Sequence, residues 1–330
     1  MKADAPLLSI RDLVVDFAPG SGRLPAVDGV SFDIGARELV CVVGESGSGK
    51  SVSALAVMGL LPETAAVSGA ISFEGRDLRA LTRRQWRSVR GQQIGMIFQE
   101  PMTSLNPVFP IGRQLVETLR AHERMSLRAS RDRAADLLDQ VGIPSPRQRL
   151  DDYPHQLSGG MRQRVMIAIA LSCSPRLLIA DEPTTALDVT IQGQLLDLLN
   201  DLRETFATAI LLITHNMGVV AEVADRVVVM YSGRIAEQAD VFSIFDAPRH
   251  PYTEGLLAST PDLFSTERRL TTIVGSMPNP AAPPPGCLFA PRCPLALDMC
   301  ARERPELRSV VGGQQSACLR AEQMAMGDKP

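Results

Sequence analysis

The 330-residue sequence lacks several features that would place it in other protein classes. No segment reaches the roughly 18 uninterrupted apolar residues that a membrane-spanning helix needs. The best candidate, 165–180, is interrupted by two serines, a proline and an arginine. The amino terminus shows no apolar signal region, and the formal net charge of -3 leaves no basic excess for nucleic acid. We therefore expect a cytosolic globular protein with no nucleic-acid partner.

The composition is that of an ordinary folded protein. Apolar residues make up 45% of the chain and charged residues 22%, which excludes a disordered or fibrous chain. A chain of this length can bury one large core and still carry appended subdomains. No internal repeat is evident.

The order of apolar segments predicts an α/β fold. Strands alternate with helices, and this alternation indicates a mostly parallel sheet covered on both faces. We predict antiparallel strands at 7–17 and 30–34, and further strands at 39–43, 71–73, 94–98, 177–180, 209–213 and 226–230. We predict helices at 50–61, where Pro62 ends the helix, from 160 onward, at 189–204 and at 217–223.

Two segments depart from this alternation. Residues 101–153 are rich in arginine, and their apolar residues recur at helical spacing before Gly142 and Pro144, which predicts an inserted helical subdomain. Residues 279–286 read NPAAPPPG, a stretch typical of a linker. We expect the last 45 residues to form a separate appendage.

A glycine-rich segment between the strand at 39–43 and the following helix fits the pattern G-x-x-x-x-G-K-[ST]. Glycines let the backbone N–H groups converge on phosphate oxygens at the amino terminus of a helix. We expect Lys50 to neutralise the β- and γ-phosphates of ATP, and the Ser51 hydroxyl to bind Mg²⁺. The predicted phosphate-binding residues are Gly44, Glu45, Ser46, Gly47, Ser48, Gly49, Lys50 and Ser51.

Two carboxylates follow the apolar strand at 177–180. Asp181 and Glu182 lie at its carboxyl end, where ligands bind in open α/β sheets. We expect Asp181 to hold the Mg²⁺ shell and Glu182 to act as the general base toward the attacking water. A solvated acidic pair at a helix start is the alternative.

A third motif narrows the class of ATPase. Residues 157–164 read LSGGMRQR and precede the strand that ends at Asp181. This segment resembles the signature sequence of ABC ATPases. Gln99, the Ala186–Asp188 segment and His215 also stand in the family's order, as its Q-loop, D-loop and switch histidine. The resemblance covers about residues 7–260.

The resemblance implies the ABC-type P-loop ATPase fold. That fold has a RecA-like, mostly parallel sheet, an antiparallel β subdomain and an inserted helical subdomain. Here we expect a small cysteine-containing C-terminal extension in addition. The predicted division is an ATP-binding core at 1–99 and 156–235, a helical subdomain with a permease-facing surface at 100–155, and an extension at 236–330.

The signature implies a site shared between two subunits. Ser158, Gly159 and Gly160 precede a helix and so form a second anion-binding helix terminus. In ABC ATPases this terminus faces the γ-phosphate bound to the partner subunit. The resemblance also implies that His215 contacts the γ-phosphate and orients the water, and that Gln99 touches Mg²⁺ and reports the nucleotide state.

Other aromatic and histidine side chains have plainer interpretations. Phe17 stands where the family places an aromatic ring against adenine, with a core phenylalanine as the alternative. We expect His122, His155 and His250 to be ordinary surface or loop histidines.

Longer stretches resemble the ATPase subunits of dipeptide and oligopeptide importers. They include FQEPMTSLNP at 98–107 and YPHQLSGGMRQRVMIAIAL at 153–171, together with HPYTEGLLAS at 250–259 and GCLFAPRCPLALDMC at 286–300. The resemblance implies three kinds of partner: a second, non-identical ATPase, two integral-membrane permeases, and a periplasmic or extracellular substrate-binding protein. It also implies a peripheral position on the cytoplasmic face of the inner membrane. Nickel, glutathione, opines or small sugars are alternative cargoes.

A non-transport ABC ATPase is the rival hypothesis. DNA-repair and chromosome-organising members place a long coiled coil or zinc insertion between the Q-loop and the signature. Here that interval is short and has no sustained heptads. Translation-associated members carry two heads in one chain, but the sequence has no second P-loop.

Four of the six cysteines lie in the last 44 residues. Cys287, Cys293, Cys300 and Cys318 follow the proline-rich stretch in a segment with little apolar content, which suggests a metal that stabilises it. The absence of a C-x-x-C pair counts against a standard zinc ribbon. Related importer subunits carry a [4Fe-4S] cluster on such a tail, so that cluster is our hypothesis, with zinc and reduced thiols as alternatives. We expect Cys41 and Cys173 to be buried core residues.

Overall fold

The computed structural model describes residues 5–99, 104–184, 189–260 and 272–325. The chain divides into two compact units. The first comprises Met1–Gly35, Leu39–Arg79 and Ile213–Pro330, and the second comprises Ala36–Glu38 and Ala80–Leu212. Among the described residues, no helix combines the length and apolar character needed to cross a membrane.

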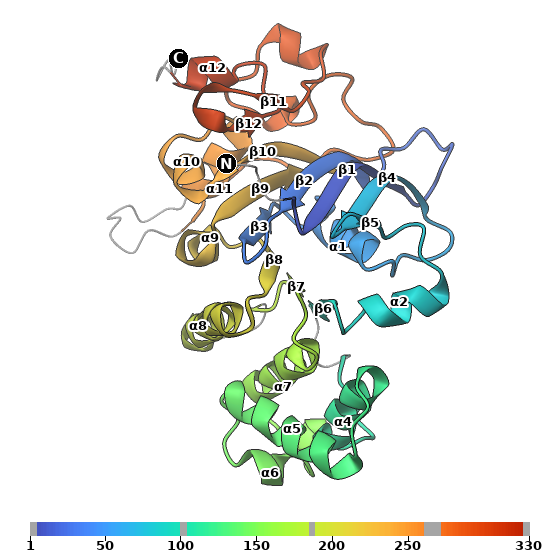
Figure 1. The fold of residues 1–330 in the computed structure, drawn as a ribbon. Coiled ribbons are helices and arrows are strands. Elements are labelled where there is room, and N and C mark those ends of the chain that lie inside the picture. The colour runs from blue at the N-terminus through green and yellow to red at the C-terminus, as the bar shows by residue number, and fades with distance from the viewer. Residues whose placement is uncertain (1–4, 100–103, 185–188, 261–271, 326–330) are drawn as a thin grey trace. The chain divides into compact units, whose positions relative to one another are not determined.

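The first unit begins with an antiparallel sheet (Figure 1). Its order is β2-β1-β4-β5, with bounds β1 (Leu8–Asp16), β2 (Val27–Ile34), β4 (Ala66–Phe73) and β5 (Arg76–Asp77). Leu8, Ile10, Leu13 and Val15 of β1 are fully buried, so their burial supplies the main free energy that holds the strand. The predicted antiparallel pairing of the first two strands is confirmed.

A second set of strands in this unit carries residues 44–51, which we call the phosphate loop. Its order is β11-β12-β10-β9-β3. The bounds are β3 (Leu39–Val43), β9 (Arg226–Tyr231), β10 (Arg234–Asp240), β11 (Arg308–Ser309) and β12 (Gln315–Ser316). Every residue of β3 is buried, and β3 pairs in parallel with β9, as its continuous apolar run predicts.

The helix that follows the loop is shorter than predicted. Helix α1 (Lys50–Val57) ends before Gly59, which adopts a φ of +59°. The N–H of Leu60 bonds to the carbonyl of Leu55, and the N–H of Gly59 bonds to that of Ala56. This is the pattern of a glycine-terminated helix. Gly59 therefore ends the helix before Pro62 is reached.

The carboxyl-terminal part of this unit differs from the prediction of a separate appendage. Strand β12 pairs with β10, since Glu237 lies opposite Ser316 in the antiparallel ladder. A two-residue strand has no recognisable sequence signal, so the pattern could not reveal this pairing. The remaining short helices are α9 (Met217–Val223), α10 (Val241–Asp246), α11 (Pro251–Ala258), η2 (Ala290–Arg292), η3 (Asp298–Ala301), η4 (Val311–Gly313) and α12 (Ala321–Ala325).

The second unit contains the strands that carry the catalytic candidates. The order β8-β7-β6 is formed by β6 (Ile94–Ile97), β7 (Leu177–Asp181) and β8 (Ala209–Thr214), whose last two residues belong to the first unit. Ile97 lies opposite Ala180 in a parallel ladder, so β6 and β7 end side by side. Helices α2 (Arg83–Val89) and α8 (Val189–Phe206) complete this region.

The arginine-rich insertion is helical, as predicted. It forms α4 (Ile111–His122), α5 (Leu127–Gln140) and α6 (Pro146–Arg149), and η1 (Pro154–Gln156) leads into α7 (Gly159–Leu171). Figure 1 shows these helices as one group in green. The predicted apolar face of α5 is buried, with Ala134, Leu137 and Leu138 each at most 1% exposed.

Candidate nucleotide site

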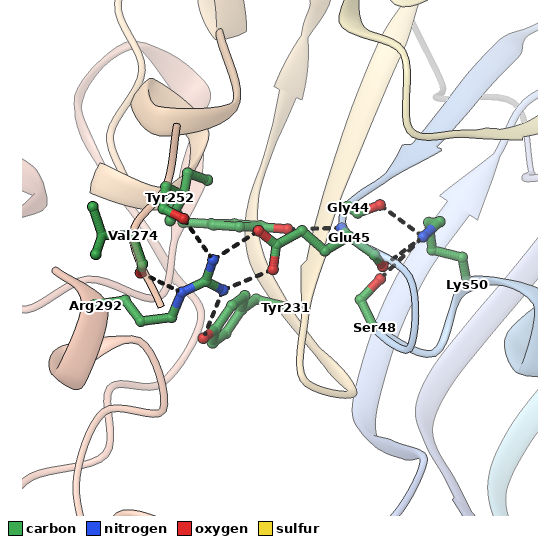
Figure 2. Close-up of polar contacts among 9 residues, drawn as sticks. Gly44, Glu45, Ser48, Lys50, Tyr231, Tyr252, Val274 and Arg292 are labelled. Atoms are coloured by element: carbon green, nitrogen blue, oxygen red, sulfur yellow. Dashed lines mark hydrogen bonds and ion pairs between the residues drawn. The ribbon is translucent and has the colours of Figure 1, made fainter. Parts of the chain in front are cut away.

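The phosphate loop encloses the side chain of Lys50. Its Nζ donates hydrogen bonds to the carbonyl oxygens of Gly44 at 2.7 Å and Glu45 at 2.8 Å, and to Ser48 Oγ at 3.3 Å (Figure 2). Lys50 is only 5% exposed. The loop itself thus fixes the ammonium at the start of α1, where backbone N–H groups already favour an anion.

Close backbone approach explains two of the loop's glycines. A Cβ on Gly44, at φ +148°, would lie 2.1 Å from the carbonyl oxygen of Met230. A Cβ on Gly49, at φ +99°, would lie 2.5 Å from that of Ala26. Real Cβ atoms do not approach oxygens this closely, so a side chain at either position would displace the loop.

An open groove adjoins the loop. Phe17 is 46% exposed, so the alternative of a core phenylalanine is wrong. The groove has a volume of about 500 Å³, and Phe17, Ser46 and Gly47 line it. An aromatic ring beside a phosphate loop suits a nucleoside base.

The proline-rich stretch also lines this groove, which the linker interpretation missed. Residues 277–280 contribute to its wall, and the carbonyl of Pro280 accepts a hydrogen bond of 2.8 Å from the N–H of Leu24. Only the Pro-Asn-Pro composition was visible in the sequence, and it does not specify which surface the segment covers.

The second unit gathers three polar groups at the carboxyl ends of its strands. Asp181 ends β7 and is 5% exposed, and Glu182 follows it with a φ of +45°. Gln99 follows β6, and its Nε2 donates a hydrogen bond of 3.0 Å to Glu182 Oε2. A left-handed backbone at a non-glycine residue costs free energy and is typical of functional sites.

The signature segment forms the start of α7. Ser158 caps this helix, and its Oγ accepts a hydrogen bond of 3.3 Å from the N–H of Met161. Gly159 and Gly160 are the first helical residues, so the predicted helix terminus is present. Gly159 is exposed, and no atom lies within 4 Å of the position that a Cβ would take there, so the start of α7 is open to solvent.

Gln163 is a structural residue that the sequence interpretation missed. It is 2% exposed, and its Nε2 donates a hydrogen bond of 2.7 Å to the carbonyl of Pro183. Gln163 thereby fastens α7 to the segment just after Glu182. The sequence did contain a sign of this role. Gln163 stands among apolar residues of the helix, and a polar side chain buried there needs a hydrogen-bond partner.

Two further predictions concern His215 and the Ala186–Asp188 segment. His215 is exposed directly after β8, in the first unit. Ala186–Asp188 lies outside the described residues. The structure therefore describes one group around the phosphate loop in the first unit and one around Glu182 in the second.

His250 differs from its predicted surface position. It is 4% exposed, and its Nδ1 accepts a hydrogen bond of 3.0 Å from the N–H of Tyr252. Burial lowers the pKa of His250 to about 4 because the charged imidazolium loses hydration. His155 is exposed and His122 is half-buried. Cys41 is buried, as predicted, whereas Cys173 is only half-buried.

The four C-terminal cysteines line one small cavity. Cys287, Cys293, Cys300 and Cys318 share it with Phe289 and His250. Burial, together with the nearby thiols, raises the pKa of Cys293 and of Cys318 to about 11. Among the residues that the structure describes, however, no group of three or more cysteine, histidine or acidic side chains has the arrangement of a metal site.

Comparison with known proteins identifies relatives that are ATP-binding proteins of transporters. Residues 27–185 match the family described as "ABC transporter", and residues 236–300 match "Oligopeptide/dipeptide transporter, C-terminal region". The oligopeptide transport ATP-binding protein AppD of Bacillus subtilis (strain 168) is 51% identical over 319 residues, which are 96% of this chain and 97% of that protein. The dipeptide transport ATP-binding protein DppD of Escherichia coli (strain K12) is 49% identical over 313 residues, 94% of this chain and 96% of that protein.

A solved structure shows the same architecture. The ATP-binding cassette MJ0796, in a dimeric post-hydrolysis state bound to ADP and inorganic phosphate, superposes with a TM-score of 0.63 at 26% identity. The match covers 71% of this chain and 98% of that one. The chain belongs to the ABC transporter family, in its α/β ATP-binding class. Its full-length relatives confirm the prediction of the ATP-binding subunit of a dipeptide or oligopeptide importer.

Proposed function

We propose that this chain hydrolyses ATP and that hydrolysis drives peptide import through a membrane complex. The observation that carries the proposal is the phosphate loop, in which Lys50 is enclosed by acceptors of the loop itself. The names of the relatives, AppD and DppD, support the peptide cargo. The other cargoes, nickel, glutathione, opines and small sugars, remain alternatives for the assay.

Each polar residue has a role in this proposal. Lys50 and the loop N–H groups bind the β- and γ-phosphates, and Phe17 stacks on the adenine. Ser51, Gln99 and Asp181 would hold Mg²⁺, which when bound would neutralise charge on the phosphate oxygens. Glu182 accepts the proton of the attacking water, and Gln99 orients that carboxylate through the 3.0 Å hydrogen bond. His215 contacts the γ-phosphate.

The active unit in this proposal contains two ATPase subunits. Helix α7 has 13 residues, and Ser158, Gly159 and Gly160 form its amino terminus, which would bind the γ-phosphate held by the partner. The dimeric ADP- and phosphate-bound state of MJ0796 supports this arrangement. ATP then joins the two subunits, and loss of the γ-phosphate separates them.

The complex would contain further subunits. We place the chain peripherally on the cytoplasmic face of the inner membrane, with a second, non-identical ATPase, two permeases and a substrate-binding protein. The helical subdomain at 100–155 would receive a cytoplasmic permease helix. We propose 1–99 with 156–235 as the ATP-binding core and 236–330 as the extension.

A pull-down from detergent-solubilised membranes tests the assembly. The tagged chain should recover two multispanning permeases and a second ATPase, identified by mass spectrometry. Phosphate release by the purified complex should rise when binding protein loaded with a peptide is added. Recovery of soluble partners alone would contradict the transport role while leaving ATP hydrolysis intact.

The cysteine cavity supports a metal cofactor only through its donor set. Four thiols around one cavity, Cys287, Cys293, Cys300 and Cys318, match the all-cysteine ligation of a [4Fe-4S] cluster, which when bound would cross-link this segment or carry one electron. The raised pKa values of Cys293 and Cys318 mean that a bound cation would be needed to keep these two as thiolates at neutral pH.

Anaerobic purification followed by iron, sulfide and zinc analysis distinguishes the three hypotheses. A brown protein with iron and sulfide in equal amounts supports the cluster. Zinc without iron supports a structural zinc site, and a colourless, metal-free protein supports reduced thiols.

A further inference from the structure

Arg292 of the carboxyl-terminal segment contacts the phosphate loop directly. Its Nη1 and Nη2 donate hydrogen bonds to the Glu45 carboxylate oxygens at 2.7 and 2.9 Å, a paired, charge-assisted geometry (Figure 2). The Arg292 side chain is only 5% exposed, whereas that of Glu45 is 29% exposed. Both residues belong to the first unit, although 247 positions separate them in the sequence.

The remaining donors of Arg292 are also used. Nε donates to the carbonyl of Val274 at 3.0 Å, Nη2 to that of Ile273 at 3.3 Å, and Nη1 to the Tyr231 hydroxyl at 3.4 Å. A guanidinium has five N–H groups, and each has a partner here. The Glu45 carboxylate accordingly raises the pKa of Arg292. This placement holds the arginine in one position.

Glu45 connects this arginine to Lys50. The carbonyl oxygen of Glu45 accepts a hydrogen bond of 2.8 Å from Lys50 Nζ, and its N–H donates one of 2.8 Å to the Tyr252 hydroxyl. The side chain and both backbone groups of one loop residue are therefore held at once. A change at Arg292 reaches Lys50 through a single intervening residue.

The same segment leads to the cysteine cavity. Arg292 ends η2 and directly precedes Cys293. Phe289, at the start of this turn, packs against Tyr231 and Tyr252, with ring centroids 5.2 and 5.4 Å away. Because Arg292 adjoins Cys293 in the chain and these rings are packed together, we expect a movement around Cys293 to be transmitted to Arg292 and the rings.

We propose that Arg292 is a positioning residue of the nucleotide site. We further propose that it couples the segment 287–293, here called the cysteine segment, to nucleotide affinity. Arg292 holds Glu45, and Glu45 fixes the loop conformation in which Lys50 faces the phosphates. The inference rests on the proposed binding of ATP at this loop. Coupling of this kind is reciprocal, so bound nucleotide must also stabilise the cysteine segment.

Nucleotide affinity is the first test, measured with a fluorescent ADP analogue and Mg²⁺ on the purified full chain. Arg292→Ala should weaken binding roughly tenfold, and Arg292→Lys should restore part of the loss. Glu45→Gln should weaken binding as well, and the double variant should lose no more than the worse single variant. Arg308→Ala is the matched control, because Arg308 pairs with Glu322 at 3.2 Å on an exposed part of the same extension.

Hydrogen exchange distinguishes coupling from a purely structural role, because a purely structural role of Arg292 would not make the exchange rate of the cysteine segment depend on nucleotide. The nucleotide should slow amide exchange across 287–293 in the parent protein and in Arg308→Ala, but not in Arg292→Ala. Urea unfolding without nucleotide checks that each variant is folded. If Arg292→Ala does not fold, the same affinity and exchange measurements are made on Arg292→Lys, which retains the buried charge.

The outcomes separate the two proposals. A parent protein that binds the ADP analogue, with a folded Arg292 variant that binds it equally well, would overturn the coupling and leave ATP binding intact. A folded parent protein that does not bind the analogue would overturn both.

Discussion

Gln99 Nε2 lies 3.0 Å from Glu182 Oε2, and this hydrogen bond joins the ends of two neighbouring parallel strands. Gln99 follows β6 and Glu182 follows β7, so the sheet register sets the distance between them. The amide N–H that donates to the carboxylate holds it in one orientation, and a general base must be held within reach of the water whose proton it accepts. The two side chains thus form a hydrogen-bonded pair at the carboxyl ends of these strands.

Replacing Glu182 by Gln should abolish ATP turnover but preserve ATP binding. The amide cannot accept the proton from water, and the expected loss in phosphate release is about 10²- to 10⁴-fold. The variant should accumulate as an ATP-bridged dimer with its partner ATPase, detectable by gel filtration. Glu204→Gln, on the exposed face of α8, is the control and should retain parental turnover. Parental turnover in Glu182→Gln would remove the general-base assignment.

Replacing Lys50 by Ala should weaken ATP binding itself. The ammonium is 5% exposed and fixed by three acceptors in the loop, so its loss removes a preset charge from the phosphate site. Hydrogen bonds to a charged group contribute about 1.5–3 kcal/mol, so a 10- to 100-fold rise in Kd is expected. Calorimetry with Mg-ATP measures it, and an unchanged Kd would place the phosphates elsewhere.

Phe17→Ala should reduce nucleotide affinity, whereas Phe17→Tyr should preserve it. The exposed ring borders the groove that contains Ser46 and Gly47, where a base can stack on it. Loss of stacking is expected to cost about 1 kcal/mol, roughly a fivefold change in Kd. Phe242→Ala removes a ring that is 76% exposed on α10 and serves as the control. Equal effects of the two alanine variants would argue against an adenine contact.

Glu237 should make the stability of the fold depend on pH. Its side chain on β10 is fully buried, and burial raises its pKa to about 7, although the N–H of Arg249 donates to the carboxylate at 2.6 Å. Between about pH 4.5 and 7 the folded protein keeps a proton that the unfolded chain has released, so the free energy of unfolding falls as pH rises.

Glu237→Gln tests this dependence, because glutamine resembles the protonated carboxyl. Relative to the variant, the parent should lose about 3 kcal/mol of stability between pH 4.5 and 8, measured by urea unfolding. Parallel stability profiles for the two proteins would show that Glu237 does not titrate in this range.

The ATP-binding class and most of the fold could be predicted from the sequence because their determinants are local. The run 39–43 predicts β3 by its unbroken apolar character, and the loop pattern follows it directly, so strand, loop and helix are specified by adjacent residues. The apolar spacing in α5 and the serine before α7 act within one or two helical turns. Helix α1 was the exception, because a single glycine, Gly59, ended it earlier than the proline did.

The contacts of the carboxyl-terminal segment were decided by tertiary structure alone. The ion pair between Arg292 and Glu45, the burial of His250, and the pairing of β12 with β10 join residues that lie far apart in the chain. Neither periodicity nor composition carries information on such pairings, since an arginine or a two-residue strand looks the same wherever it packs. The sequence by itself therefore determined which residues form the loop between β3 and α1. Only the folded chain decided that Arg292, beside Cys293, holds the loop on which they lie, because burial and charge pairing depend on what surrounds a side chain in space.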